Sequence, residues 1–304
     1  AWKKQPQYMF DHYIHVLSDI FKGKKAKVNF ILVGACDGTH DITISQGYLP
    51  NDHWRGVFVE PFEINYNDLT NFMKKSNVLD RTHLIHAAAT NVCNSTTIKM
   101  KRPTFEEKNK SLPHWMRREI GAVVPFDKLD RPASGGWIFE YVRCVNGPEI
   151  LKDWAVALSK NLSKKKKSKF PVRIRPHILK VDVEGHDYQV LSGFIADDVP
   201  VTELPLLISF EAKSIVKQFD LLKDQMTKRG YVMSSHIAND GFAMLKPEVF
   251  LRGRKPSQAA ADAGDAIGEY IQKIPNPDDP EGGRKGKRKG GKKNKKNRKK
   301  SQSD

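Results

Sequence analysis

The stretch that decides the fold is Val28-Asn29-Phe30-Ile31-Leu32-Val33, which runs directly into Gly34-Ala35-Cys36-Asp37-Gly38. The first six residues are mostly branched and aromatic, which is typical of a buried strand. Glycine lets the chain turn sharply and lets a ligand approach the backbone. Because ligands of open α/β sheets bind beyond the carboxyl ends of the strands, residues 34–38 are a candidate binding loop. The alternative is an ordinary turn between a strand and a helix.

Short apolar strands recur along the chain, with helical segments between several of them. Further strands are predicted at 57–59, 83–85, 178–181 and 206–210. Helices are predicted from the spacing of apolar residues within 64–73, 188–194 and 215–226. Strands that alternate with helices predict an α/β fold, with a mostly parallel sheet covered on both faces.

The chain divides into three parts by composition. Residues 1–27 contain an amphipathic helix, residues 28–252 form the folded domain, and residues 253–304 are polar and expected to be disordered. Within the domain, a long insertion at about 91–177 interrupts the alternation of strands and helices. Apolar runs on both sides of Asp240-Gly241 predict a closing antiparallel hairpin.

The net charge of +17 is concentrated at the end of the chain. Residues 284–300 hold twelve Lys and Arg and no aromatic residue. This composition predicts contact with a polyanion without reading of bases. Nucleic acid, an anionic membrane surface, acidic glycans and a nuclear-import signal all fit. The alternative is a solvated run of charge.

The three cysteines, Cys36, Cys93 and Cys144, are few and odd in number, which argues against a disulfide framework. No apolar run is long enough to span a membrane, so a soluble chain is expected. Because the sequence begins at Ala1, a processed or truncated N-terminus stays open. Three glycosylation sequons permit a secretory route, so the compartment stays undecided between the secretory or Golgi lumen and the cytoplasm. The sequons are at Asn94, Asn109 and Asn161.

The glycine spacing and Glu60 together indicate the kind of cofactor. The loop has the pattern Gly-x-x-x-Gly, which counts against a nicotinamide or flavin dinucleotide. Glu60 ends the second strand and Pro61 follows it. A carboxylate at that place can accept hydrogen bonds from both hydroxyls of a ribose. The pattern predicts a nucleoside cofactor without phosphates, and the alternative for Glu60 is a solvated strand end.

Three motifs in this order resemble the FkbM-type methyltransferase family. They are Ile31–Thr39, Trp54–Pro61 and Leu179–Gly185, and the resemblance extends from about Val28 to Leu245. It implies the class I methyltransferase fold, which is Rossmann-like, with S-adenosylmethionine as cofactor and usually a hydroxyl oxygen as acceptor. The cofactor-binding residues expected on this basis are Gly34, Ala35, Cys36, Asp37, Gly38, Glu60, Pro61, Ala88 and Asp182.

Charged residues follow the strand at 178–181. Lys180, Asp182 and Glu184 alternate, so they share one face, and Lys180 with either carboxylate is a candidate structural ion pair. A hydroxyl acceptor must lose a proton, and Asp182, His186 and Glu211 are the candidate catalytic residues. Alternatively, Asp182 and Glu211 hold a divalent cation, although the sequence shows no dense cluster of metal ligands.

Acceptor contacts are expected from the insertion and from the strand end. Trp115 and Arg117 lie in a segment that resembles the acceptor side of family members. An indole can stack on a sugar or another flat group, and a guanidinium can bind an anion. Glu184 is the third candidate substrate contact, since it follows Asp182 at the strand end.

The sequence therefore predicts a methyltransferase that acts on a hydroxyl oxygen of a small molecule, sugar or glycan. A second hypothesis is a methyltransferase acting on nucleic acid or protein and recruited by the basic tail. A third is a non-catalytic protein that binds polyanions. The loop 34–38 with Glu60 favours an enzyme, and Asp182-Val183-Glu184 stands where methyltransferases of base amines carry an Asn/Asp-Pro-Pro-Tyr type of motif.

Overall fold

The computed structural model describes residues 6–23, 26–39, 41–93, 96–103, 122–123, 137–163, 174–233, 240–246 and 249. The predicted tail at 253–304 lies outside these residues. The helices are α1 (Pro6–Gly23), α2 (Glu63–Lys75), α4 (Gly147–Ser163), α5 (Asp187–Phe194) and α6 (Phe219–Lys228). Shorter helical turns are η2 (Ile42–Tyr48, π-helical), η3 (Leu79–Arg81), η6 (Val201–Glu203) and η7 (Ala212–Gln218). The strands are β1 (Val28–Val33), β2 (Trp54–Glu60), β3 (Thr82–His86), β4 (Ala88–Ala89), β5 (Thr97–Pro103), β6 (Ala122–Val123), β7 (Trp137–Val145), β8 (Ile178–Val181), β9 (Leu207–Phe210), β10 (Tyr231–Met233) and β11 (Gly241–Leu245).

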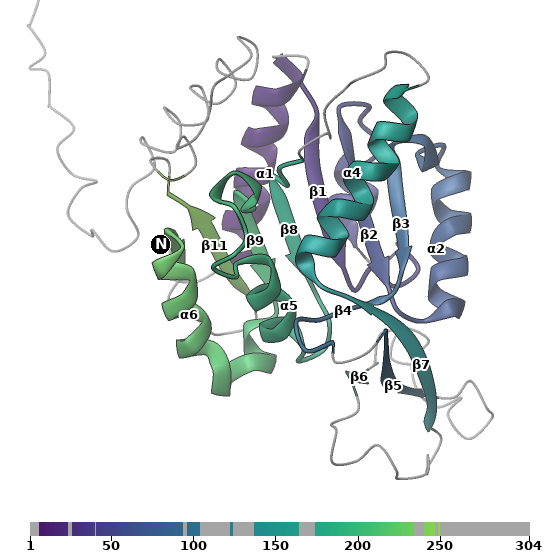
Figure 1. Ribbon diagram of the computed structural model, residues 1–304. Coiled ribbons are helices and arrows are strands. Elements are labelled where there is room, and N and C mark those ends of the chain that lie inside the picture. Colours follow the sequence, from purple (N-terminus) through teal and green to yellow (C-terminus); the bar gives the residue numbers. More distant parts are fainter. Residues whose placement is uncertain are drawn as a thin grey trace, which may run out of the picture.

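A seven-stranded sheet forms the centre of the molecule, in the order β10-β11-β9-β8-β1-β2-β3 (Figure 1). β1 pairs in parallel with β2 and β8, and the two halves of the sheet extend outward from it. β11 runs antiparallel to β9 and to β10, so the predicted closing hairpin is confirmed. From β1 the strands follow in the order β2-β3 on one side and β8-β9 on the other, all of them parallel. This arrangement is the Rossmann-like, class I methyltransferase fold expected from the sequence.

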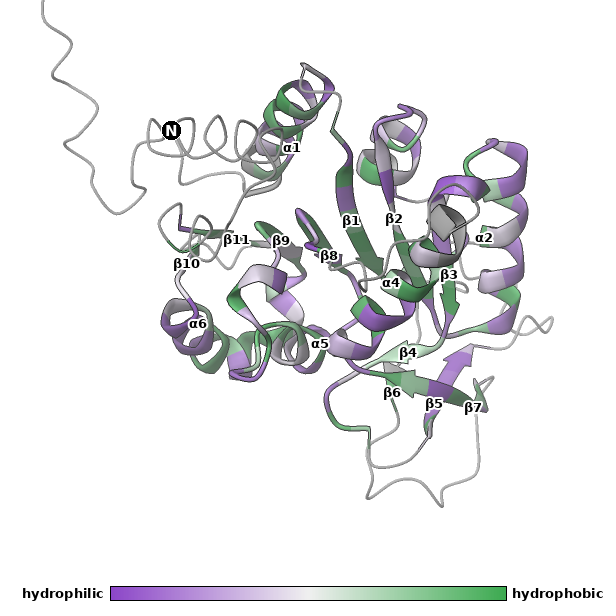
Figure 2. Ribbon diagram, turned by 45° about the horizontal axis from the view of Figure 1, so that its top comes forward, coloured by the Kyte–Doolittle hydropathy of each residue, from purple (hydrophilic) through white to green (hydrophobic). Residues whose placement is uncertain are grey.

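Helices cover both faces of this sheet, as predicted. α4, α5 and α6 lie in front of the sheet in Figure 1, and α1 lies behind it. All six residues of β1 are buried, which explains why the strand is an almost unbroken apolar run. Figure 2 shows hydrophobic residues along the central strands and mixed faces on helices such as α2.

The predicted N-terminal helix packs onto the core. Phe10, Tyr13, Ile14 and Leu17 recur at helical spacing in α1 and are buried. Tyr13 stacks on Phe242 of β11, with 5.5 Å between the ring centroids. The helix therefore covers the back of β11 and β1 instead of standing apart from the domain.

A second, smaller sheet lies at the carboxyl ends of the parallel strands (Figure 1). Its order is β4-β7-β5-β6, and β5 pairs antiparallel with both β7 and β6. Met100 and Val142 on one face of the β5–β7 ribbon form a small apolar cluster with Phe62 and Ala88. This cluster joins the second sheet to the end of β2 and to β4.

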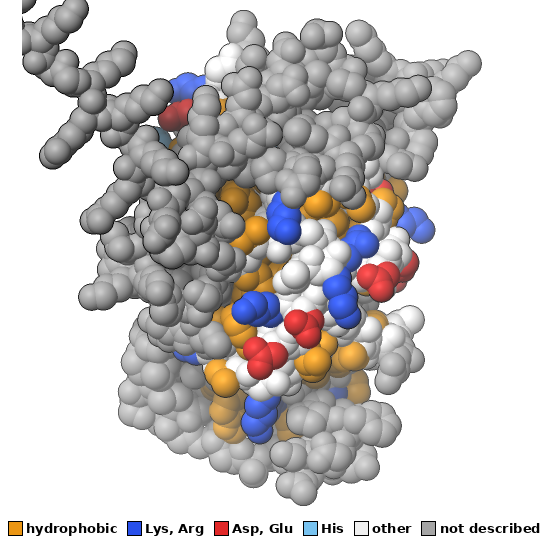
Figure 3. Space-filling view, turned by 90° about the vertical axis from the view of Figure 1, so that its left-hand side faces the viewer, with side chains coloured by type: hydrophobic (Ala, Val, Ile, Leu, Met, Phe, Trp, Pro, Cys, Tyr) orange, Lys and Arg blue, Asp and Glu red, His pale blue; other side chains and the backbone are white. Residues whose placement is uncertain are grey.

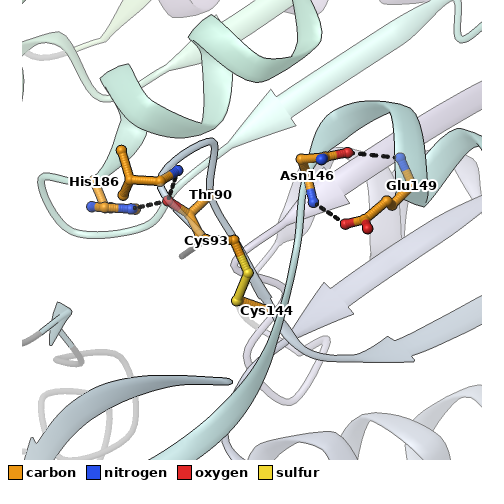
Figure 4. Close-up of a disulfide and its surroundings, with 7 residues drawn as sticks. Thr90, Cys93, Cys144, Asn146, Glu149 and His186 are labelled. Atoms are coloured by element: carbon orange, nitrogen blue, oxygen red, sulfur yellow. Dashed lines mark hydrogen bonds between the residues drawn. A yellow bond between two sulfur atoms is a disulfide. The ribbon is translucent and has the colours of Figure 1, made fainter. Parts of the chain in front are cut away.

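Helix α4 lies within the segment 91–177 that the sequence marked as an insertion. Ile150 and Trp154 are buried in the main core, so this part of the segment covers the central sheet. Asn146 and Glu149 start the helix with a reciprocal capping box, in which each side chain accepts the other residue's amide at 2.9 and 2.8 Å (Figure 4). This helix was not predicted from the sequence, although the capping box and the spacing of its apolar residues indicate it.

A disulfide joins Cys93 and Cys144, with 6.0 Å between the Cα atoms (Figure 4). This contradicts the expectation drawn from the small, odd number of cysteines. The pairing depends on β4, because Ala88 lies opposite Cys144 and the chain after β4 then returns along the end of β7. A count of cysteines cannot reveal that proximity. Cys36 is a buried free thiol.

Among the described helices, none combines the length and apolar character that crossing a bilayer requires.

Truncation of Trp154 tests the role of α4 in the core. The indole is 1% exposed, so Trp154→Ala should lower the free energy of unfolding by about 3–5 kcal/mol. The matched control is Val156→Ala in the same helix, where the side chain is 47% exposed and the change should stay within about 0.5 kcal/mol. Chemical denaturation of both variants measures the difference. Equal effects would show that α4 is not part of the core.

Candidate active site

A cavity of about 240 Å³ opens at the carboxyl ends of β1, β2 and β8. It brings together residues from all three sequence motifs, and Met100 of the second sheet closes one side. The residues that line it are Leu32, Gly34, Ala35, Cys36, Asp41, Glu60, Pro61, Phe62, Asn65, Met100, Lys180, Asp182, Val183 and Glu184.

Gly34 is required by a close approach between β1 and β8. Its φ is +80°, and a Cβ atom there would lie 1.8 Å from the Asp182 carbonyl oxygen. Any side chain would therefore push the end of β1 away from β8. Cys36 also has a positive φ, of 49°, which turns its amide toward Glu60. The glycine loop thus places backbone amides on the wall of the cavity.

Glu60 is a buried carboxylate held by three donors. Its Oε2 accepts the Cys36 amide at 2.9 Å, and its Oε1 accepts the Phe62 amide at 3.0 Å and the Asn65 side-chain amide at 3.3 Å. Burial raises the pKa of Glu60 to about 7, although these three hydrogen bonds lower it. A carboxylate has about four acceptor positions, so Glu60 retains capacity for a ligand hydroxyl.

Asp37 and Gly38 shape the loop from outside the cavity. Asp37 Oδ1 accepts the Thr39 amide at 2.9 Å and its hydroxyl at 2.7 Å, which closes the turn. Gly38 has a φ of +80°, and a Cβ there would lie 2.8 Å from Leu69 of α2. Neither residue is among the described residues that line the cavity. They were predicted as cofactor contacts, and the structure places them where they support the loop.

A small apolar cavity of about 30 Å³ adjoins the main one and contains Ala88 and His186 among its walls. His186 Nε2 lies 2.9 Å from Thr90 Oγ1, next to the Cys93–Cys144 disulfide (Figure 4). Burial lowers the pKa of His186 to about 4. The ring is therefore neutral near pH 7, and it faces this apolar side of the site.

Asp182 follows β8 and faces the main cavity. Its side chain keeps exposed area, yet the surrounding protein removes much of its bulk water, and this desolvation raises its pKa. The positive charge of Lys180 opposes the rise, whereas the carboxylates of Glu211, Asp240 and Asp41 add to it. Asp182 is therefore a carboxylate with increased affinity for a proton, at the point where the cavity opens.

Lys180 pairs with Asp41, not with Asp182 or Glu184 as the sequence suggested. The Lys180 ammonium lies 2.5 Å from Asp41 Oδ2. Asp41 also caps η2, since its Oδ1 accepts the amides of Ile44 and Ser45. Burial lowers the pKa of Lys180, but the attraction of Asp41 and Asp182 outweighs it, and the net pKa is raised. The ion pair was unpredictable because 139 residues separate its members.

Glu211 lies at the end of β9, beside the cavity and not among its described lining residues. Its carboxylate binds Lys213 Nζ at 2.6 Å and the Ser214 hydroxyl. The Glu211 amide donates to Asp187 Oδ1 at 3.1 Å. Asp187 is fully buried, and burial raises its pKa to about 7. The predicted catalytic residue Glu211 is thus occupied by local contacts.

Several residues of this site were not predicted from the sequence. Asn65 lies five residues after Glu60 on the first turns of α2, and a buried polar residue so near a strand-end carboxylate is a usable signal. Met100 gave no signal, because it reaches the cavity from the second sheet. The predicted substrate residues Trp115 and Arg117 lie outside the described residues. Within the described part of the chain, no group of three His, Cys, Asp or Glu side chains is arranged to hold a metal ion.

The segment of the chain that contains Asp182, Glu184 and Glu211 matches the sequence model of a known family. Residues 163–233 match the family model of the methyltransferase FkbM domain. The match covers β8, β9 and the turn after β8, and it confirms the resemblance inferred from the sequence motifs. It supports an S-adenosylmethionine-dependent methyltransferase. A search of curated protein sequences gave no significant match.

Solved methyltransferase structures have low sequence identity to this chain and low TM-scores. The METTL16 methyltransferase domain is 12% identical, with a TM-score of 0.38, and the alignment covers 76% of this chain and 65% of that domain. Precorrin-6y C5,15-methyltransferase from Geobacter metallireducens is 8% identical, with a TM-score of 0.34 and coverage of 76% and 87%. The O-methyltransferase TomG from Streptomyces achromogenes is 8% identical, with a TM-score of 0.34 and coverage of 76% and 78%.

Substitution of Gly34 tests the contact between β1 and β8. Gly34→Ala should lower the affinity for S-adenosylmethionine at least tenfold, because the new Cβ displaces the loop or the Asp182 backbone. The control is Gly23→Ala at the end of α1, where nothing lies within 4 Å of the added Cβ. Isothermal titration calorimetry compares the two. Wild-type affinity in Gly34→Ala would show that the close contact between the Gly34 and Asp182 backbones is not needed for cofactor binding.

The raised pKa of Glu60 predicts a pH dependence of stability. The folded protein holds the Glu60 proton up to about pH 7, whereas the unfolded chain releases it near the ordinary value of 4.5. Folding is therefore favoured at low pH, and stability falls as the pH rises from about 4.5 through 7.

Glu60→Gln should reduce this fall by about 1–3 kcal/mol, measured by urea denaturation between pH 5 and 8. Glu63→Gln, an exposed neighbour on α2, should leave the slope unchanged. Asp187 also has a raised pKa and contributes a similar fall in every variant. The quantity to compare is therefore the change of the free energy of unfolding with pH in each variant relative to the wild type. An unchanged slope in Glu60→Gln would contradict the shift assigned to Glu60.

Proposed function

We propose that this protein transfers a methyl group from S-adenosylmethionine to a hydroxyl oxygen of a small molecule, sugar or glycan. The observation that carries the proposal is the main cavity, where the backbone of Gly34–Cys36, the buried Glu60 and Asp182 meet. The FkbM domain match supports the methyltransferase part of this proposal. The hydroxyl acceptor is an inference from the residues around Asp182 and from the family resemblance.

The donors and acceptors of the cavity fit a nucleoside cofactor without phosphates. Glu60 can accept a ribose hydroxyl at its remaining acceptor position, and the apolar cavity beside Ala88 can take the adenine ring. Among the described lining residues, Lys180 is the one cation, and Asp41 neutralises it. A phosphate group would meet Glu60 and Asp182 without a compensating charge. These contacts favour S-adenosylmethionine over a dinucleotide.

When bound, S-adenosylmethionine would supply a methyl group attached to a positively charged sulfur. Asp182 is our proposed base, because it faces the cavity and its pKa is raised. It would accept the proton that the acceptor hydroxyl loses as its oxygen bonds to the methyl carbon. The bond between that carbon and the sulfur would break at the same time, and S-adenosylhomocysteine would leave. Glu184, exposed on the same wall, is proposed to bind the acceptor.

His186 and Glu211 take supporting roles in this proposal. The neutral His186 ring lines the adenine side and, through Thr90, links α5 to the segment after β4. Glu211 adds negative charge near Asp182, which raises the affinity of Asp182 for a proton. Both residues would therefore act through their neighbours.

The compartment is proposed from the disulfide. Disulfides persist mainly in oxidising environments such as the secretory lumen. The Cys93–Cys144 bond therefore favours a secretory or Golgi lumen over the cytoplasm. The sequon at Asn94 adjoins Cys93 and is consistent with that route.

Two measurements test the proposed function. Calorimetric titration with S-adenosylmethionine should give a dissociation constant between about micromolar and sub-millimolar, and Glu60→Ala should raise it at least tenfold. A labelled-methyl screen against glycans, small hydroxylated molecules, RNA and protein should then identify the acceptor. For that acceptor, Asp182→Asn should lower the transfer rate by about 10²–10⁴.

The control is Asp198→Asn, which changes an exposed carboxylate away from the cavity. Absence of binding heat at millimolar S-adenosylmethionine would refute the proposed enzymatic function. Labelling of RNA or protein, and of no hydroxylated small molecule or glycan, would refute the acceptor class. An unchanged rate in Asp182→Asn would remove Asp182 as the base.

A further inference from the structure

The main cavity and the small apolar cavity of the candidate site adjoin each other. Gly34, Pro61, Met100 and Val183 line both of them. The small cavity has a volume of about 30 Å³, which is room for roughly two water molecules. A purine is a bicyclic ring and needs several times that volume. The adenine of the proposed cofactor can therefore enter this cavity only if one of its walls moves.

A larger cavity between the ends of α5 and α6 is no alternative site for the base. It has a volume of about 420 Å³, and its walls include Asp197, Lys228 and Arg229. Figure 3 shows the side of the molecule that carries α6, where Lys and Arg are intermixed with Asp and Glu among the coloured side chains. None of the described residues that line this cavity lines the main cavity. Because adenine is bonded directly to the ribose, its site must adjoin the wall that holds Glu60.

Most walls of the small cavity are fixed by the central fold. Four of its apolar walls are buried in the main core, and they are Val33, Val59, Ala87 and Ala89. Interiors of this kind are close-packed, so these side chains have little room to shift. His186 is held in place by Thr90, at 2.9 Å (Figure 4). A wall that yields to a purine must therefore come from another part of the structure.

Met100 is the wall that can move. It is 7% exposed and packs with Phe62, Ala88 and Val142 in the small cluster, which is separate from the main core. A methionine side chain is unbranched and has three rotatable bonds, so it adapts to the shape of its neighbours. Val123, the other described wall from the second sheet, is branched at Cβ and stiff. Met100 can therefore widen the cavity by rotation of its side chain, without displacement of a strand.

We propose that Met100 is the residue that determines which base the cofactor site accepts. Its side chain would turn aside to admit adenine and would then pack on the ring, since a thioether makes favourable contacts with aromatic rings. The length of the side chain would limit the size of the base that fits. This inference rests on the proposed function, which places adenine in the small cavity. A shorter side chain at position 100 would join the two cavities and admit a purine with a larger substituent.

Isothermal titration calorimetry of the full chain tests the proposal with S-adenosylhomocysteine and two enlarged analogues. One analogue carries a benzyl group on the 6-amino group of adenine, and the other carries a phenyl group on carbon 2. The measured quantity is the dissociation constant of each analogue divided by that of S-adenosylhomocysteine. Met100→Ala should lower this ratio at least tenfold for at least one analogue, because the lost side chain makes room for the substituent. Met100→Val, which removes less buried volume, should lower it about threefold and serves where Met100→Ala does not fold.

The matched control is Val142→Ala. Val142 is 6% exposed in the same cluster as Met100, but it is not among the described residues that line either cavity. Its truncation should lower the thermal stability in the same way as Met100→Ala and leave both ratios unchanged.

Three outcomes would overturn the proposal. Unchanged ratios in the Met100 variants, with S-adenosylhomocysteine still bound, would remove Met100 as the selecting residue and leave the proposed methyl transfer intact. An equal fall of the ratios in Val142→Ala would assign the effect to looser packing of the cluster. Absence of S-adenosylhomocysteine binding in the wild-type chain would refute the proposed function, and the role of Met100 with it.

Discussion

The close approach of the backbone at Gly34 to that at Asp182 is the constraint on which the candidate site depends. The Asp182 amide donates to the Val33 carbonyl at 3.0 Å, and the Gly34 amide donates to the Val59 carbonyl at 3.0 Å. The end of β1 is therefore fixed between β2 and β8, with no room for a Cβ atom. This brings Glu60 and Asp182, which are distant in sequence, to two walls of one cavity.

A buried carboxylate opposes folding, and Glu60 illustrates how the site accommodates one. Desolvation favours its protonated form, whereas three hydrogen-bond donors favour the charged form. Two of the donors are backbone amides positioned by the glycine loop and by the entry to α2. The loop conformation and the carboxylate thus stabilise each other, and about one acceptor position on Glu60 remains for a ligand.

The second sheet connects features that are separate in the sequence. Through Met100 it closes the cavity, and through Cys144 it is tied covalently to the segment after β4. That segment contains Thr90, which contacts His186 beside the small apolar cavity. The described strands of the second sheet are therefore structurally coupled to the walls of both cavities.

The sequence by itself determined the parallel sheet, the closing hairpin and the residues at its strand ends. These follow from local signals: apolar runs make strands buried on both faces, and glycine with strand-end carboxylates marks the carboxyl edge. Helix α4 was also encoded locally, by Asn146 and Glu149, and was overlooked. Only the tertiary structure decided the Lys180–Asp41 pair, the Cys93–Cys144 bond and the place of Met100 in the cavity. Each of these joins residues far apart in the chain, and their proximity is set by how the sheets pack, which no local pattern of residues specifies.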